Sequence, residues 1–246
     1  HKVIDPLFLD ALKAELEEIK ALKVAKTREQ RLQEYRKKLS QLTFLDPAAG
    51  SGNFLTETYL SLRRLENEAL YEENHGQMLL GVKGEYNSIQ VSIGQFYGIE
   101  INDFAVTVAK TALWIAESQM MQETEKLMQI NLNFLPLKSY ANIVEGNALR
   151  IDWESVVPKE KLNYIMGNPP FVGYSLQSKE QKSDILSIYV DEKGKSYKTA
   201  GKIDYVAGWY FKATMLMIGT EIRTAFVSTN SITQGEQVAG VCGADG

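Results

Sequence analysis

The sequence predicts an α/β fold in which a mostly parallel sheet is covered by helices on both faces. The main observation is that short, apolar, β-forming stretches alternate with longer segments that carry apolar residues at helical spacing. Parallel strands require such long crossovers, and the alternation therefore favours a parallel sheet over hairpins. The composition agrees, because 246 residues with 44% hydrophobic and 24% charged residues can bury one substantial core.

The chain opens with a helical segment, residues 1–42, in which apolar positions recur at helical spacing among many charged residues. We expect two helices there, with a break near Thr27. Residues 43–246 form the predicted α/β domain. Its strands are predicted at 43–46, 96–100, 141–145, 162–166 and 224–229, and its helices at 54–73, 103–121 and 204–219. The weakly patterned stretch 76–92 is interpreted as an insertion.

Composition and charge exclude several classes of protein. The net charge of −4 is not that of a free-standing nucleic-acid binder, so a nucleic-acid partner would need its main binding surface elsewhere. The single cysteine, Cys242, provides neither a disulfide framework nor a thiolate metal cluster, and His1 and His75 lack ligand spacing. No signal peptide and no apolar stretch long enough to span a membrane is present, and we expect a cytoplasmic protein without a metal or membrane partner.

Candidate binding residues fall where three predicted strands end, which is where ligands bind in parallel sheets. Gly50 and Gly52 follow the first strand and allow a ligand to approach the backbone closely. Glu100 ends the second strand, where a carboxylate can accept hydrogen bonds from ribose hydroxyls, and Asn147 follows the third, where it can reach an adenine edge. Each also has an ordinary structural explanation, as an incomplete glycine motif, an exposed strand-end acid or a turn residue.

The sequence Asn168-Pro169-Pro170-Phe171 follows the fourth predicted strand. Two prolines stiffen this turn and remove two backbone donors, so that it presents carbonyl acceptors, and the Asn168 side-chain oxygen adds another. Two acceptors aimed at an amino group draw its lone pair out of conjugation and make it nucleophilic. The aromatic ring can stack on a base taken out of its duplex. A plain proline-rich turn is the alternative.

In this order, the segments Asp46–Phe54, Gly98–Ile101, Gly146–Ala148 and Asn168–Phe171 resemble the S-adenosylmethionine-binding and catalytic motifs of amino-directed DNA methyltransferases. The chain is most similar to the methyltransferase region of fused restriction and modification polypeptides, types IIG and IIL, which methylate adenine at N6. Further similarity in the segments 97–116, 177–182 and 204–209 extends the resemblance over most of the chain. The resemblance implies a Rossmann-like, doubly wound class I methyltransferase fold, with 43–246 as its catalytic domain.

The resemblance also implies a cofactor, a substrate and residue roles. The cofactor would be S-adenosyl-L-methionine, and the substrate double-stranded DNA with a flipped adenine. The implied cofactor-binding residues are Asp46, Ala48, Gly50, Gly52, Glu100, Ile101, Asn147 and Ala148. Asn168 and the Pro169 carbonyl would hold the target amine, next to Pro170, with Phe171 stacked on the base. Ala49 stands where the family often has Cys, and Asn147 stands where related enzymes often have Asp, which leaves the adenine contact open.

The family's first cofactor motif would lie before His1, and its last catalytic motif and target-recognition domain after Gly246. We therefore expect a truncated catalytic domain whose partner is the remainder of a longer polypeptide. Related turns also serve enzymes that methylate cytosine N4, guanine N2 in RNA or protein glutamine, and these alternatives stay open. So do a module that binds cofactor or partners without turnover, and a nicotinamide-dependent dehydrogenase, although Glu100 comes later than the dinucleotide fingerprint places its acid.

Overall fold

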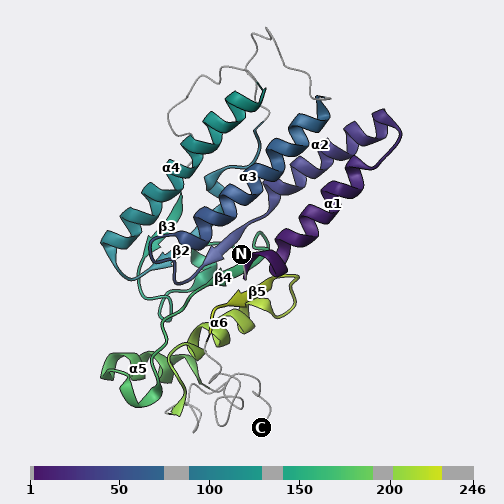
Figure 1. Ribbon diagram of the computed structural model, residues 1–246. Coiled ribbons are helices and arrows are strands. Elements are labelled where there is room, and N and C mark those ends of the chain that lie inside the picture. The colour runs from purple at the N-terminus through teal and green to yellow at the C-terminus, as the bar shows by residue number, and fades with distance from the viewer. Residues whose placement is uncertain (1–2, 75–88, 129–140, 191–201, 229–246) are drawn as a thin grey trace.

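The computed structural model describes residues 3–74, 89–128, 141–190 and 202–228, and contains a five-stranded parallel sheet (Figure 1). Its strands are β1 (Phe44–Asp46), β2 (Phe96–Glu100), β3 (Asn142–Glu145), β4 (Tyr164–Gly167) and β5 (Arg223–Phe226). The order across the sheet is β3-β2-β1-β4-β5, and every neighbouring pair is parallel. The order thus reverses between β1 and β4, which is the point where parallel sheets bind ligands. The predicted fold class is confirmed.

Six α-helices lie in the described part of the chain, together with four shorter helical turns (Figure 1). The helices are α1 (Asp10–Lys20), α2 (Ala25–Gln41), α3 (Asn53–Glu73), α4 (Asp103–Met128), α5 (Lys179–Ile188) and α6 (Ala207–Met217). The turns are a π-helical turn, Asp5–Leu9, and 3-10 turns at Ile93–Gln95, Trp153–Ser155 and Tyr174–Leu176.

The two faces of the sheet carry separate hydrophobic cores, because successive side chains of a strand point to opposite faces. Phe44 lies in the core beneath α1 to α4, where its ring stacks on those of Phe96 at 5.2 Å and Tyr164 at 5.4 Å. Leu45 points the other way, into a core that it shares with Trp153 and with residues of α5 and α6. Figure 1 shows the same division, with α1 to α4 on one side of the sheet and α6 on the other. The helices of residues 1–42 therefore share a core with the sheet.

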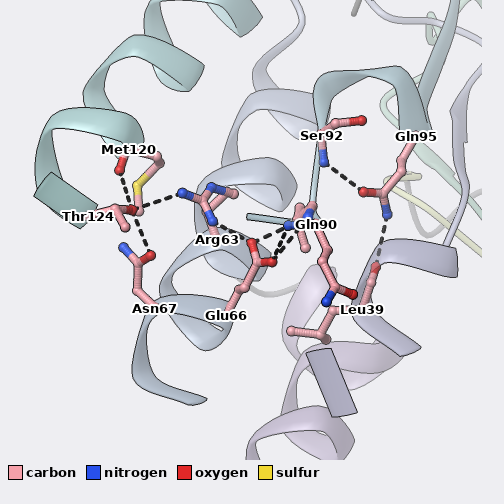
Figure 2. A network of polar contacts seen from close by, with 10 residues as sticks. Leu39, Arg63, Glu66, Asn67, Gln90, Ser92, Gln95, Met120 and Thr124 are labelled. Atoms are coloured by element: carbon pink, nitrogen blue, oxygen red, sulfur yellow. Dashed lines mark hydrogen bonds and ion pairs between the residues drawn. The ribbon is translucent and has the colours of Figure 1, made fainter. Parts of the chain in front are cut away.

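A buried polar network fixes the path of the chain into β2 (Figure 2). Arg63 and Glu66, both completely buried on α3, form an ion pair. Arg63 also donates to the Thr124 hydroxyl on α4 at 2.9 Å, and Glu66 accepts the backbone N–H groups of Gln90 at 2.5 Å and Val91 at 3.3 Å. The network thus ties α3, α4 and the residues that enter β2, the strand that ends at Glu100.

Several strand and helix ends differ from the predicted ones by one to three residues, and three larger differences stand out. Thr27 lies inside α2 rather than at a break, because the backbone is extended at Val24 and a helix starts at the next residue. Helix α4 continues past residue 121 because its buried face continues through Thr124 and Met128. Helix α5 was not predicted, although Ser178 forms a capping box with Gln181, a pattern that sequence alone can reveal.

Some predictions fall on residues outside the described ranges. These include the insertion up to residue 88, the end of the last strand, and His1, His75 and Cys242. Within the described ranges, no helix is long and apolar enough to cross a membrane, and His, Cys, Asp and Glu side chains form no group of three that could hold a metal ion.

Candidate functional site

The loop between β1 and α3 folds tightly around two glycines. Gly50 and Gly52 have φ values of +54° and +80°, in the left-handed region that favours glycine. The Gly52 N–H donates to the Ala49 carbonyl at 2.8 Å, and α3 starts at Asn53. A Cβ at Gly52 would lie 3.0 Å from the Cβ of Ala109, so α4 packs directly against the loop. The loop therefore presents backbone and a helix N-terminus at the sheet edge, as a close ligand contact requires.

Asp46, the last residue of β1, is a buried acid with spare hydrogen-bonding capacity. Its Oδ1 accepts the Ala48 N–H at 2.9 Å, whereas Oδ2 is buried without a partner in the described residues. Burial raises the pKa of Asp46 to about 7, the Ala48 hydrogen bond opposes this shift, and the Glu100 charge adds to it. A Cβ on Gly167 would lie 2.5 Å from Oδ1, so the last residue of β4 must be small for the strand ends to meet. Asp46 thus lies directly beside the start of the Asn-Pro-Pro-Phe loop.

Glu100 connects the ends of β1, β2 and β3. Its Oε2 accepts the Gly50 N–H at 2.8 Å, and its Oε1 accepts the Asn102 N–H at 3.0 Å. Its backbone carbonyl accepts the Gly146 N–H at 2.8 Å. The next residue, Ile101, is 67% exposed, an unusual position for a large apolar side chain. Each carboxylate oxygen keeps a second lone pair, and the pair of residues therefore offers acceptors beside an apolar surface.

Asn147 follows β3 and has both of its side-chain groups engaged. Its Nδ2 donates to Asp184 Oδ2 at 2.9 Å, and its Oδ1 accepts the Leu149 N–H at 2.9 Å. Asp184, on α5, is buried and also accepts Arg150 Nε at 2.6 Å and the Tyr205 hydroxyl at 2.9 Å. Asn147 is therefore held in one orientation by a residue 37 positions further along the chain.

The loop after Asn147 is also held from α6. The ammonium group of Lys212 donates to the Ala148 carbonyl at 2.8 Å and to that of Ile151, and it lies 5.4 Å from the Trp153 ring centroid. Partial burial lowers the pKa of Lys212 to about 8, and the Asp152 charge opposes the shift. The Trp153 indole N–H donates to the same Ala148 carbonyl at 2.8 Å. Both side chains thereby fix the backbone of the loop.

The loop formed by residues 168–171 is anchored at both ends. The Gly167 carbonyl, just before it, accepts the Val227 N–H at 3.0 Å, which extends the pairing of β4 with β5. The Val172 carbonyl, just after it, accepts the Tyr205 N–H at 2.9 Å. The loop is therefore fixed to the ends of the sheet and to the start of α6.

Between these anchors the loop faces solvent. Asn168 and Pro170 are exposed, Phe171 is 43% exposed and Pro169 is buried. Among the described residues, the Asn168 side chain and the Pro169 carbonyl have no hydrogen-bond partner. The loop thus presents two uncommitted acceptors next to an accessible aromatic ring, which suits an amino group on a planar, stackable substrate.

All the predicted site residues therefore lie at one edge of the sheet, at the ends of β1 and β2 or on the loops that follow β1 to β4. Sequence reasoning missed Asp184, Tyr205 and Lys212, which hold these loops without belonging to them. Trp209 is buried, as a large aromatic side chain in a core usually is, and its indole N–H also donates to the Pro47 carbonyl at 2.9 Å. The start of α6 thus contacts the loops after β1, β3 and β4.

A parallel sheet of this order, with a glycine loop after β1, an acid at the end of β2 and an Asn-Pro-Pro-Phe loop after β4, defines the class I methyltransferase fold. Residues 22–243 match the family described as MmeI, DNA-methyltransferase domain, and the chain belongs to that family. The resemblance inferred from the motifs is confirmed.

Two relatives agree with this assignment. DNA methyltransferase A of Bacillus subtilis (strain 168) is 40% identical over 242 residues, which cover 97% of this chain and 26% of the relative. The solved structure of the type IIL restriction-modification enzyme MmeI in complex with DNA superposes with a TM-score of 0.86 at 43% identity, over 97% of this chain and 30% of that one. The chain thus spans less than a third of the length of either relative.

Proposed function

We propose that this chain is the catalytic part of a DNA methyltransferase that uses S-adenosyl-L-methionine to methylate adenine at N6. The observation that carries the proposal is the close approach of Asp46 to Gly167, which brings the buried acid at the end of β1 next to the acceptors of residues 168–171. A methyl donor and an amino acceptor must meet at such a junction for direct transfer. DNA as the substrate class is supported by the relatives, one named a DNA methyltransferase and the other solved in complex with DNA.

The residues present fit the cofactor. The partnerless Oδ2 of Asp46 can accept a donor from the amino-acid end, and Glu100 has lone pairs left for ribose hydroxyls. Ile101 offers apolar surface to the adenine ring, and Gly50, Gly52, Ala48, Asn147 and Ala148 line the approach. When bound, S-adenosyl-L-methionine supplies a methyl group that its positive sulfonium makes electrophilic.

The residues of the loop after β4 prepare the acceptor. Asn168 Oδ1 and the Pro169 carbonyl accept the two hydrogens of the adenine amino group and leave its lone pair directed at the methyl donor. Pro170 keeps the turn rigid, so that these acceptors do not reorganise during the reaction. Phe171 stacks on the flipped base, which offsets about 1 to 3 kcal/mol of the stacking lost on leaving the duplex.

The remainder of the polypeptide is the proposed partner. Both relatives are much longer than this chain, and the structure of one of them was solved in complex with DNA. Net charge of −4 leaves little electrostatic attraction for DNA in this chain, so target recognition falls to the remainder. From the proposed DNA substrate we infer a cytoplasmic location.

The test is to incubate the complete polypeptide with DNA and S-adenosyl-L-methionine labelled in its methyl group, and then to digest the DNA to nucleosides. We expect the label in N6-methyladenine. Label in N4-methylcytosine would support a DNA methyltransferase but show that its target base is cytosine rather than adenine. Label only in RNA or protein, or none at all, would overturn the proposal.

A further inference from the structure

Asp184 is a buried carboxylate to which three side chains from two separate segments donate hydrogen bonds. Arg150 Nε donates to Oδ1 at 2.6 Å, and Asn147 Nδ2 and the Tyr205 hydroxyl each donate to Oδ2 at 2.9 Å. The residue is only 3% exposed. A buried carboxylate lowers stability unless such donors compensate, and well-packed apolar residues often replace such groups without loss. Its presence here therefore calls for a role other than packing.

The donors belong to the two halves of the site. Asn147 lies in the loop after β3, on the proposed cofactor side. Tyr205 uses its hydroxyl for Asp184 and its backbone N–H, at 2.9 Å, for the carbonyl of Val172, the residue that follows Phe171. One carboxylate thus connects the loop on the cofactor side with the end of the loop that holds the target amine.

The same contact explains why Asn, rather than the Asp common in related enzymes, stands at position 147. A carboxylate at 147 would face the Asp184 carboxylate at hydrogen-bonding distance, and two adjacent carboxylates repel each other. The amide of Asn147 instead donates to Asp184 through Nδ2 and accepts the Leu149 N–H through Oδ1. Residues 147 and 184 are therefore complementary.

We propose that Asp184 is a positioning residue that couples the cofactor loop after β3 to the target loop after β4. It does so through the hydrogen bonds that it accepts from Asn147 and Tyr205. The catalytic role of this coupling rests on the proposed function. It holds both loops in one mutual arrangement, so that the donor side and the acceptor side of the site align together.

Arg150 provides the matched control. Its side chain is 59% exposed, and an ion pair with so exposed a partner contributes little in water. Arg150→Gln removes the charge of this third donor and leaves the hydrogen bonds from Asn147 and Tyr205 to Asp184 in place. Asp184→Asn, in contrast, removes the charge that strengthens the hydrogen bonds from Asn147 and Tyr205, and its amide NH₂ faces either these two donors or Arg150.

The experiment compares Asp184→Asn and Arg150→Gln with the wild type in the complete polypeptide. The single-turnover methylation rate should fall about tenfold or more in Asp184→Asn, and stay within about twofold in Arg150→Gln. Amide hydrogen exchange without any ligand gives an independent measure. Asp184→Asn should speed exchange at Leu149 and at Tyr205 together, and leave that at Ser92, which is bonded to Gln95, unchanged.

The double variant Asn147→Asp/Asp184→Asn tests the pairing itself. The amide introduced at position 184 can donate one hydrogen to the carboxylate introduced at position 147, which reverses the hydrogen bond, and its second hydrogen to the Tyr205 hydroxyl, while its oxygen accepts from Arg150 Nε. We therefore expect the double variant to methylate faster than Asp184→Asn alone, a non-additivity that reports direct interaction. A double variant no faster than Asp184→Asn would overturn the pairing.

Tyr205→Phe keeps the proposal testable if Asp184→Asn does not fold, because it removes one hydroxyl only. Exchange should then rise at Leu149 as well as at Tyr205; a rise confined to residue 205 would overturn the coupling. Unchanged exchange and rate in Asp184→Asn, or an equal loss in Arg150→Gln, would do the same. If the wild type transfers no methyl group but exchange responds as stated, the proposed function fails while the coupling stands.

Discussion

The carboxylate of Glu100 accepts the backbone N–H of Gly50 at 2.8 Å, and thereby joins the end of β2 to the glycine loop after β1. Its other oxygen accepts the Asn102 N–H at 3.0 Å, at the turn into α4. A single acid therefore orders the two loops through bonds within the chain. Pre-ordering reduces the entropy lost on binding.

Glu100→Ala should therefore weaken the binding of S-adenosyl-L-methionine, measured by calorimetry without DNA. The variant loses hydrogen bonds to a charged acceptor, each worth about 1.5 to 3 kcal/mol, which corresponds to about tenfold to a hundredfold in Kd. Glu145→Ala is the matched control, because Glu145 is the exposed acid opposite Glu100 at the end of β3. Equal affinities of Glu100→Ala and the wild type would remove Glu100 from the site.

Asn168→Ala should separate catalysis from cofactor binding. The substitution removes one of the two proposed acceptors for the target amine and changes neither the glycine loop nor Glu100. Loss of one such preorganised group typically slows the chemical step by about a hundredfold to a thousandfold. We expect that loss in single-turnover methylation, together with a Kd for S-adenosyl-L-methionine close to that of the wild type. Full activity in this variant would contradict the assigned role.

The sheet and the four site loops could be predicted from the sequence because each depends on a local pattern. Short apolar stretches specify the strands, and the residues that follow each strand are placed at one edge by the topology of a parallel sheet. The loops containing Gly50, Glu100, Asn147 and Asn168 could thus be located without coordinates. Whether these residues bind their proposed ligands stays a prediction.

The supports of the loops could not be predicted in this way. Asp184 contacts Asn147 across 37 positions, and Lys212 contacts Ala148 across 64. Such contacts depend on how α5 and α6 pack, and no periodicity in either helix identifies a polar partner so distant in the chain. Trp209 is a further example. Its aromatic ring could be expected to be buried, whereas its hydrogen bond to the distant Pro47 carbonyl could not be predicted.

Asp46→Asn should change how stability depends on pH. Burial raises the pKa of Asp46 from 3.8 to about 7, so the folded state holds a proton that the unfolded state releases. The bound proton contributes up to a few kcal/mol to the free energy of unfolding. This contribution is fully present below pH 3.8 and is lost as the pH rises through about 7. The neutral Asn variant lacks it. The free energy of unfolding of Asp46→Asn, relative to wild type, should therefore increase from about pH 5 to about pH 8 in urea titrations. Parallel pH profiles of the two proteins would contradict the buried-acid argument.

Gly52→Ala should destabilise the protein more than Gly219→Ala. Both glycines have left-handed backbones, with φ values of +80° and +72°, so both substitutions introduce strain of about 1 to 2 kcal/mol. A Cβ at Gly52 would also lie 3.0 Å from Ala109 Cβ and 3.1 Å from its Cα, whereas nothing lies within 4 Å of a Cβ at Gly219. Overpacking of this kind adds about 1 to 3 kcal/mol. If urea unfolding gives equal losses of unfolding free energy for the two variants, α4 shifts to accommodate the added methyl group and the overpacking argument is wrong.

Arg63→Met should lower the free energy of unfolding by about 3 to 5 kcal/mol, because it leaves the completely buried Glu66 carboxylate without its cation. The Met side chain is similar in length to the aliphatic part of the Arg side chain but carries no charge. The double variant Arg63→Met/Glu66→Gln should recover part of the loss, since the Gln oxygen can still accept the Gln90 N–H that Glu66 binds at 2.5 Å, without an unpaired charge. Urea unfolding of the two variants and the wild type measures the difference. If the double variant is less stable than Arg63→Met, the cost lies in packing around Thr124 rather than in the unpaired charge, and the electrostatic explanation of this network is wrong.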